Sequence, residues 1–252
     1  MKSNYYKRAA MWTLFLALIV VSFNGVIEAK TEYSSYQKGL RSFREGQYEE
    51  AVSDLVEAII DAPDRMYPHY ILGLTYSRLG EYASAETQLK KAHQINSKHY
   101  RVMVNLARVY LRESKVEEAV AVLEKAVKVN SVEDDAYNVL GQSYDKRGNL
   151  DKAIFNYKKA VEANGNNYYA LNNLGYSYIK SGQYQEAIKY LKEAVKLKPQ
   201  IPYLYNNLGI AYERSGQLTE AKDSYQEALL INPDYSKAEI NLKRVDSKLD
   251  DN

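Results

Sequence analysis

The sequence predicts an all-α solenoid built from six helical hairpins, and three observations carry this prediction. Small residues recur every 34 positions along most of the 252-residue chain. Apolar residues follow helical spacing on both sides of a regular break: Leu171 and Leu174 precede Gly182, and Ala187 and Leu191 follow it. A hairpin of this size cannot bury two apolar faces alone, so successive copies must cover one another.

The repeat is defined by columns that run through six copies without an insertion or a deletion. Three columns hold small residues that allow two helices to approach closely, at Gly39, Gly73, Ala107, Gly141, Gly175 and Gly209, at Ala51, Ala85, Ala119, Ala153, Ala187 and Ala221, and at Ala58, Ala92, Ala126, Ala160, Ala194 and Ala228. The turn inside each hairpin favours glycine for its backbone freedom and falls at Gly46, Gly80, Ser114, Gly148, Gly182 and Gly216. In five copies a tyrosine large enough to fill the space between hairpins lies three residues after the first-column residue, at Tyr76, Tyr110, Tyr144, Tyr178 and Tyr212.

These columns resemble those of the tetratricopeptide repeat (TPR) family over residues 32–235, and proline closes three copies at Pro63, Pro199 and Pro233. The resemblance implies a right-handed α-superhelix in which the first helix of each repeat lines an inner, peptide-holding groove. The six expected repeats are residues 32–65, 66–99, 100–133, 134–167, 168–201 and 202–235. Residues 236–252 carry an amphipathic stripe that predicts a C-terminal helix capping the open end of the array.

Residues 1–29 lie outside the repeats and predict export from the cytoplasm. Lys2, Lys7 and Arg8 precede the uncharged run Ala9–Phe23, and Ala29 offers a small residue for cleavage. A cleaved signal peptide and an uncleaved anchor spanning residues 9–27 both fit, since a membrane span needs about 20 residues. Either reading places the repeats in the periplasm or outside the cell, with membrane contact only through residues 9–27.

Charge and composition exclude several classes of function. Beyond residue 29 the chain has 31 basic and 31 acidic side chains, which argues against general nucleic-acid binding. There is no cysteine, and His69, His93 and His99 lack the spacing of a zinc site, so neither a metal nor a cofactor is expected. No phosphate loop, nucleophile elbow or catalytic carboxylate pair is present, so the sequence predicts a protein that is not an enzyme.

The resemblance places the candidate peptide-binding residues on the first helix of each repeat. Asparagine side chains there can donate to and accept from an extended backbone, cations can attract acidic segments, and tyrosines offer rigid apolar contact. The candidates are Tyr36, Tyr70, Arg78, Asn105, Arg112, Asn138, Lys146, Asn172, Asn173, Tyr176, Lys180, Asn206, Asn207 and Arg214. Each group also has a purely structural interpretation, because the cations lie in a last helical turn, where the helix dipole favours them.

The expected partner is therefore a protein or peptide that lies along the groove, its aromatic end at repeats 1–2 and its acidic parts at repeats 4–6. Repeat 1 suggests an alternative, because Tyr33, Tyr36, Leu40 and Phe43 form an apolar row on its first helix. This row fits either a capping repeat or a face that docks into the groove of a second copy. Self-association into a structural homo-oligomer is thus the alternative function.

Overall fold

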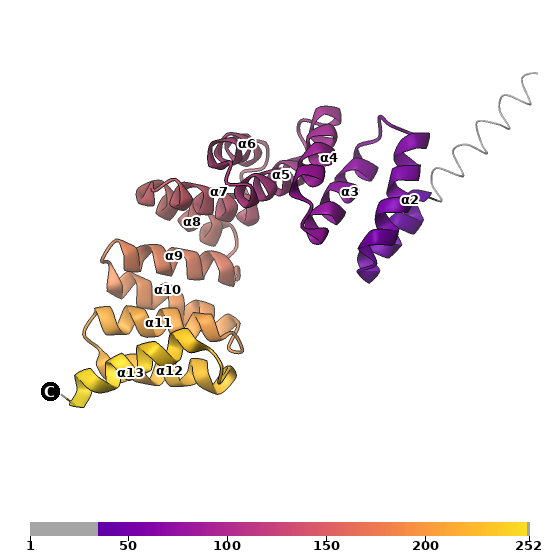
Figure 1. The fold of residues 1–252 in the computed structure, drawn as a ribbon. Helices are drawn as coiled ribbons and strands as arrows, with labels where there is room; N and C mark the ends of the chain where they lie inside the picture. Colours follow the sequence, from indigo (N-terminus) through magenta and orange to yellow (C-terminus); the bar gives the residue numbers. More distant parts are fainter. Residues whose placement is uncertain (1–34, 251–252) are drawn as a thin grey trace, which may run out of the picture. The chain divides into compact units, whose positions relative to one another are not determined.

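Residues 35–250 are described by a computed structural model, and the described chain consists of helices joined by short connections (Figure 1). Residues 35–45 are helical, and no strand occurs among the described residues. The following helices are α2 (Tyr48–Asp61), α3 (Met66–Leu79), α4 (Tyr82–Ile95), α5 (Tyr100–Arg112), α6 (Val116–Val129), α7 (Asp134–Lys146), α8 (Leu150–Ala163), α9 (Tyr168–Lys180), α10 (Tyr184–Leu197), α11 (Pro202–Arg214), α12 (Leu218–Ile231) and α13 (Ser236–Asp250). The predicted all-α helical-repeat fold is confirmed, while the predicted export segment at residues 1–29 lies outside the described residues.

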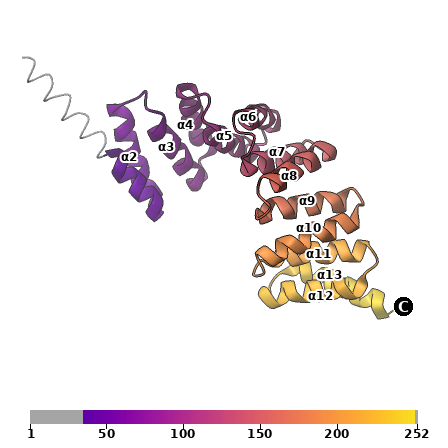
Figure 2. The same ribbon diagram turned by 180° about the vertical axis from the view of Figure 1, so that it is seen from behind.

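The described chain divides into two compact units, and the boundary between them along the sequence lies within α5. The N-terminal unit comprises residues 35–109 and the C-terminal unit comprises residues 110–250. In the C-terminal unit, α9, α10, α11 and α12 follow one another as stacked layers (Figures 1 and 2). From α6 to α13 each helix packs on the next one in the chain, as expected for repeats that bury their apolar faces against neighbours.

The small-residue columns are the places where the two helices of a hairpin touch. The second and third columns lie on the second helices of the hairpins, and all twelve of their alanines are fully buried. At Gly175 an added Cβ would lie 2.6 Å from Leu191 Cγ and 3.3 Å from the Ala187 carbonyl oxygen. Gly141 and Gly209 meet the rings of Tyr157 and Tyr225 in the same way. Close helix contact therefore explains the columns, because any larger residue would push the two helices apart.

The turn column is explained by backbone conformation rather than by space. Gly46, Gly80, Gly148, Gly182 and Gly216 all have φ between 76° and 83°, and nothing lies within 4 Å of a Cβ placed there. This left-handed conformation closes the first helix, as in the bond from Gln183 N to Tyr178 O at 2.9 Å. Repeat 3 has Ser114 at this position with φ of 61°, where a side chain is strained.

Replacing Ser114 by glycine is expected to raise the free energy of unfolding by about 1 kcal/mol, because glycine adopts the left-handed conformation without strain. Urea denaturation of the purified chain measures the change. Ser131→Gly is the matched control, since Ser131 is an exposed loop serine without a positive φ. It should be neutral or slightly destabilising through the entropy of the unfolded chain. An equal gain in both variants would refute strain at Ser114 as the cause.

The connections after the second helices use asparagine in a way that the sequence columns did not reveal. In four repeats the side-chain oxygen of an asparagine accepts from the backbone N–H two residues later, at Asn96, Asn130, Asn164 and Asn232. The backbone N–H of each asparagine also caps its helix by donating to the carbonyl of the third-column alanine. These Asx turns direct the chain from one hairpin into the next.

The first helix of repeat 1 is part of the packed array in its described residues. Tyr36, Leu40 and Phe43 are half-buried and pack against the core that contains Leu55 and Leu72. Tyr33, the remaining member of the predicted apolar row, lies outside the described residues. Most of the row that suggested a docking face is therefore covered by α2 and α3.

Helix α13 covers the end of the array and takes the place of a first helix. Val245 is fully buried, and Leu242 and Leu249 pack against the cluster around Tyr225 of α12. Helix α13 also contacts α11, the preceding first helix. The predicted C-terminal helix thus continues the layer of first helices, and no second helix follows it within residues 35–250.

Candidate peptide-binding face

In the C-terminal unit the first helices form a layer of their own. Helices α7, α9, α11 and α13 contact one another in succession, whereas α8, α10 and α12, the second helices, have no such contacts in the described chain. The first helices are therefore closer together and form the inner side of this unit. On α9, Tyr169, Asn173, Tyr176 and Lys180 share one face, because they are spaced at i, i+4, i+7 and i+11.

A ladder of asparagine amides joins the first helices. Its three rungs are each one Nδ2 donating to one Oδ1 of the preceding first helix: Asn173 to Asn138 at 3.0 Å, Asn207 to Asn172 at 2.9 Å, and Asn241 to Asn206 at 2.8 Å. The accepting side chains are buried, so each rung satisfies a polar group that would otherwise be costly to bury. The ladder therefore holds consecutive repeats in register.

The ladder limits what the predicted asparagines can offer to a partner. Asn138, Asn172 and Asn206 are buried acceptors, so their carbonyl groups are already used. Asn173 and Asn207 are half-exposed, and each commits one amide hydrogen to its rung. Their second amide hydrogens are the groups with which these residues would contact a peptide. Contact with a peptide stays a prediction for all five.

The predicted cations differ from one another in their surroundings. Lys180 Nζ pairs with Asp145 of α7 at 2.6 Å and lies 5.5 Å from the centre of the Tyr176 ring. Lys146 and Arg214 are exposed and form no ion pair among the described residues. Arg78 and Arg112 are likewise exposed at the ends of their helices. The cationic column is thus partly neutralised within the protein itself.

Glu213 is the other acidic group that neutralises cations of this layer. Its side chain is 6% exposed and accepts from Arg244 Nε at 2.8 Å, Arg244 Nη2 at 2.7 Å, Lys248 Nζ at 2.8 Å and the Tyr225 hydroxyl at 2.9 Å. Burial alone would raise the pKa of Glu213, but these hydrogen bonds outweigh burial and lower the pKa to about 2. The cluster fastens α13 to the end of repeat 6.

These contacts follow one spacing rule. Side chains 35 residues apart meet across consecutive first helices. Equivalent positions in consecutive repeats are 34 residues apart, so each contact joins one position to the position after its equivalent in the next repeat. The rule covers the asparagine rungs, the Asp145–Lys180 and Glu213–Lys248 ion pairs, and the bond from Asn105 Nδ2 to the Tyr70 hydroxyl at 3.0 Å. The sequence contains this signal, but it appears only when residues are compared along the diagonal between repeats.

The predicted tyrosines divide into packing and exposed groups. Tyr36 is half-buried in the core cluster of α2 and α3. Tyr70 is half-buried as well, and desolvation raises the pKa of its hydroxyl. Tyr176 is 42% exposed and its neighbour Tyr169 is 55% exposed, both on the shared face of α9. Tyr169 and Tyr176 are therefore the aromatic side chains of the C-terminal unit with most surface available on the first-helix layer.

Sequence reasoning missed an aromatic cluster in the N-terminal unit. The ring of His99 lies 5.9 Å from that of Tyr67, 5.7 Å from that of Tyr70 and 6.4 Å from that of Tyr100. His99 Nδ1 accepts from the backbone N–H of Val102, and burial lowers the pKa of His99. The sequence suggests no role for His99, because it lacks zinc-ligand spacing, whereas in the structure its ring packs against tyrosines at the start of α5.

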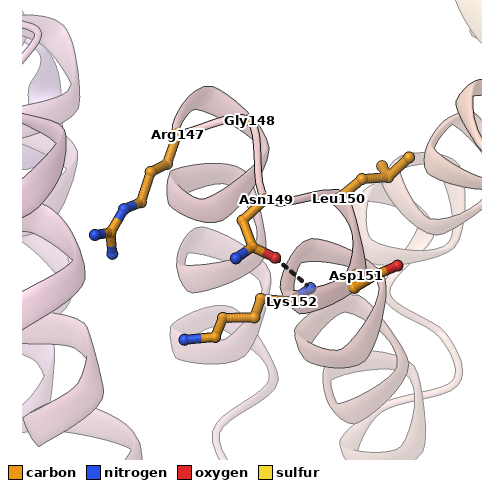
Figure 3. A pocket seen from close by; sticks show the side chains of 6 residues that line it. All are labelled: Arg147, Gly148, Asn149, Leu150, Asp151 and Lys152. Carbon is orange, nitrogen blue, oxygen red and sulfur yellow. Dashed lines mark hydrogen bonds between the residues drawn. The ribbon is translucent and has the colours of Figure 1, made fainter.

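A hollow lies at the turn between α7 and α8 (Figure 3). It has a volume of about 520 Å³ and is lined by Arg147, Gly148, Asn149, Leu150, Asp151 and Lys152. Asn149 Oδ1 accepts from Lys152 N at 3.1 Å, which caps α8, and Arg147 pairs with Glu117. The polar groups of this open hollow therefore have structural roles.

Neither a metal-ligand cluster nor a membrane-spanning helix is found among the described residues. Within residues 35–250 no group of three or more His, Cys, Asp or Glu side chains is placed to hold a metal ion. In the same part of the chain no helix combines the length and the apolar character that a membrane span requires.

Comparison with known proteins gives matches to repeat families. The model described as the tetratricopeptide repeat protein 21 C-terminal ARM domain matches residues 28–208, and the tetratricopeptide repeat model matches residues 202–235. No curated protein matches the sequence.

Several solved structures are similar in fold. A chain of Pseudomonas aeruginosa pilF has a TM-score of 0.75 at 16% identity, over 88% of this chain and 99% of that one. YrrB, a TPR protein whose structure is reported with an unusual peptide-binding site, has a TM-score of 0.61 at 22% identity, over 75% of this chain and 97% of that one. A chain of the APC/C hetero-tetramer Cut9–Hcn1 has a TM-score of 0.73 at 17% identity, over 85% of this chain and 42% of that one.

Proposed function

Because the chain belongs to the tetratricopeptide repeat family, we propose that it is a non-catalytic scaffold that binds an extended segment of a partner protein on its layer of first helices. The observation that carries the proposal is the composition of that layer. Buried asparagines join its helices, while Tyr169, Tyr176, Lys146 and Arg214 keep exposed surface that the packing does not use. The peptide-binding site reported for YrrB supports the same use of a related fold.

Binding on this layer has a physical basis that does not require a deep pocket. An extended peptide exposes unpaired backbone groups, and the second amide hydrogens of Asn173 and Asn207 can donate to its carbonyls. Tyrosines provide large contact areas with little loss of side-chain entropy on binding. The asparagine ladder fixes the spacing between helices, so the face is organised before a partner arrives.

The test is a crosslinking pull-down from the source cells with two matched double variants. Tyr169→Ser with Tyr176→Ser removes exposed aromatic surface from the first-helix layer. Phe155→Ser with Leu230→Ser removes comparable exposed surface, 58% and 77% exposed, from second helices. We expect the first pair to lose the partner and the second pair to retain it, with unchanged circular dichroism in both.

Asparagine substitutions are a poorer test, although the sequence suggests them first. Asn173→Ala would leave the buried oxygen of Asn138 without its donor, so lost binding could reflect a lost rung of the ladder. The serine variants avoid this ambiguity. Retention of every partner by the Tyr169–Tyr176 variant, or loss of the same partner from both variants, would contradict binding on this layer.

We further propose that the scaffold acts outside the cytoplasm. The support is the sequence of residues 1–29, with cations before an uncharged apolar run and a small residue after it. N-terminal sequencing of the protein from cells tests this: a start at Lys30 indicates cleavage, and an intact N-terminus in the membrane fraction indicates an anchor. A protein recovered intact in the cytosolic fraction would contradict export.

A further inference from the structure

On the first-helix layer of the C-terminal unit a row of asparagines runs between two rows of apolar side chains. Asn173 of α9 and Asn207 of α11 occupy equivalent positions, 34 residues apart. A tyrosine lies four residues before each asparagine and an apolar side chain lies three residues after it, so all share one face of their helix. These flanking residues are Tyr169 and Tyr203 on one side, and Tyr176 and Ile210 on the other. The face is therefore a polar row with apolar borders.

The two exposed tyrosines of this face are held in position by their neighbours. The ring of Tyr169 packs on that of Tyr168, with 4.0 Å between the ring centres. The ring of Tyr176 lies 5.5 Å from Lys180 Nζ, and Lys180 is itself paired with Asp145. Because both rings are positioned before a partner arrives, packing on them costs little side-chain entropy.

The asparagine row offers hydrogen-bond donors at a regular interval. Asn173, Asn207 and Asn241 each donate one amide hydrogen to the preceding first helix. An asparagine amide has two hydrogens, and the second one of these three side chains forms no hydrogen bond within residues 35–250. All three side chains are half-exposed. The row thus presents one N–H donor on each of α9, α11 and α13 to a ligand that carries carbonyl oxygens at the same interval.

That interval matches three residues of a polyproline II helix. Consecutive first helices bring Cα atoms within 8 Å of one another, and helices in such contact have axes about 8–10 Å apart. A polyproline II helix rises about 9 Å in three residues, after which the same side faces the protein again. A β-strand covers about 10 Å in three residues, but the residue three positions on points to the opposite side. Polyproline II can therefore present equivalent carbonyls to all three asparagines.

The charges of the layer favour a segment without basic side chains. Arg214 shares the face of Asn207, seven residues and about two turns further along α11, and is exposed. Lys146 is exposed at the end of α7, and neither cation forms an ion pair within residues 35–250. The carboxylates of Asp145 and Glu213 are already bound by cations of the protein. An acidic side chain of a partner is therefore attracted, whereas a basic one finds no open carboxylate there.

We propose that the first-helix face of α9, α11 and α13 binds a proline-rich segment of a partner protein in the polyproline II conformation, with acidic rather than basic side chains. The asparagine row donates to every third backbone carbonyl of the segment. Its proline rings pack on Tyr169 and Tyr176, and its acidic side chains reach Arg214. This inference rests on the proposed scaffold function and names the chemistry of the partner.

Proline suits this face for two physical reasons. It has no backbone N–H, so the segment leaves no donor unpaired against the apolar rows, while its carbonyls remain free to accept. A proline-rich chain is also extended before it binds, and aromatic-lined surfaces recognise such chains at a low cost in conformational entropy. A flexible chain of the same length would have to be ordered on binding.

The test measures binding of four labelled dodecapeptides to the full chain by fluorescence anisotropy. The first consists of four Pro-Pro-Glu triplets. The second is its mirror image in D-amino acids, the third has glycine in place of every proline, and the fourth has lysine in place of every glutamate. We expect the first to bind at least about tenfold more tightly than each of the others, because these lack the handedness, the preformed conformation and the charge, respectively, that the face requires.

Two matched double variants locate the binding. Tyr169→Ser with Tyr176→Ser should weaken binding of the acidic proline peptide about tenfold or more, because both exposed rings are removed. Phe155→Ser with Leu230→Ser removes exposed apolar surface from second helices and should leave the affinity unchanged. Unchanged circular dichroism in both variants shows that the fold is retained.

Two single variants test the charge of the segment. Arg214→Gln should weaken the acidic proline peptide several-fold and reduce the salt dependence of its binding, since an attracting cation is lost. Lys192→Gln removes the same charge from an exposed position of α10, a second helix, and should leave both quantities unchanged. Equal effects of the two substitutions would mean that the peptide responds to the charge of the whole protein.

The outcomes separate this inference from the scaffold function. The proline-rich partner would be overturned by equal binding of the mirror-image, glycine or lysine peptide, by equal losses within either pair of variants, or by no binding of the acidic proline peptide at about 1 mM. None of these results would alter the crosslinking test, in which loss of the partner from the Tyr169–Tyr176 variant still supports a scaffold for another kind of segment. If that variant retains every partner, the scaffold function fails too.

Discussion

Replacing Gly175 by valine is expected to lower the free energy of unfolding by about 3 kcal/mol, because the position has no room for a side chain. The first added carbon would overlap Leu191, and the nearby Ala187 carbonyl belongs to the backbone of α10, which cannot rotate away. Helices α9 and α10 would have to separate, and both are tied to their neighbours by the stacked repeats. Urea denaturation measures the loss.

Gly165→Val is the matched control for this prediction. Gly165 lies in the exposed connection before α9, and a Cβ there would have only the Val161 carbonyl oxygen near it, at 3.9 Å. The control should change the free energy of unfolding by less than about 0.5 kcal/mol. Similar losses in both variants would mean that close contact between α9 and α10 is not what requires glycine at position 175.

Replacing Glu213 by glutamine is expected to lower the free energy of unfolding by about 2 kcal/mol near neutral pH, because the charged hydrogen bonds to Arg244 and Lys248 lose their acceptor charge. The effect should concentrate at the C-terminal end, since α13 depends on this cluster. Hydrogen exchange should show faster opening of α13 and the end of α12 than of α9 and α10.

The contribution of Glu213 should also depend on pH in a defined direction. Its pKa is about 2 in the folded protein against 4.5 as the ordinary value, so the unfolded state binds the proton more readily. The stabilisation is therefore present above about pH 4.5 and is lost as the pH falls from there toward 2. We expect the stability difference between the wild type and Glu213→Gln to be large at neutral pH and to shrink across that interval.

Glu239→Gln provides the charge control for this second prediction. Glu239 lies on the exposed face of α13 and pairs with Lys243 one turn away. Removing this charge should affect stability much less, because an exposed ion pair on a helix surface contributes little. A difference between wild type and Glu213→Gln that stays constant from neutral to acidic pH would contradict the assigned role of the ionised carboxylate.

The repeat architecture could be predicted in detail because its determinants are local and recur. A glycine at position 175 and alanines at positions 187 and 194 act through size alone, and size can be seen in the sequence. The turn at Gly182 acts through a backbone angle that glycine adopts most easily. Repetition at 34 residues then makes each weak signal strong, since the same requirement appears six times.

The candidate site was predicted less completely because its chemistry depends on pairing between repeats. Asn172 and Lys180 were correctly placed on first helices, but nothing in a single column reveals that their partners are Asn207 and Asp145. In the sequence, an asparagine whose amide bonds to the next repeat cannot be told from one whose amide contacts a peptide. The same holds for His99, whose role comes from three tyrosine rings brought around it.

The sequence by itself determined the all-α repeat, its period, its turns and the side chains that must be small. The tertiary structure decided which polar groups form hydrogen bonds and ion pairs within the protein and which remain exposed. The physical reason is the offset between adjacent first helices, which brings together residues 35 apart and so creates the asparagine ladder and the Glu213 cluster. That offset belongs to the packing of helices in consecutive repeats, which a single column of the sequence does not record.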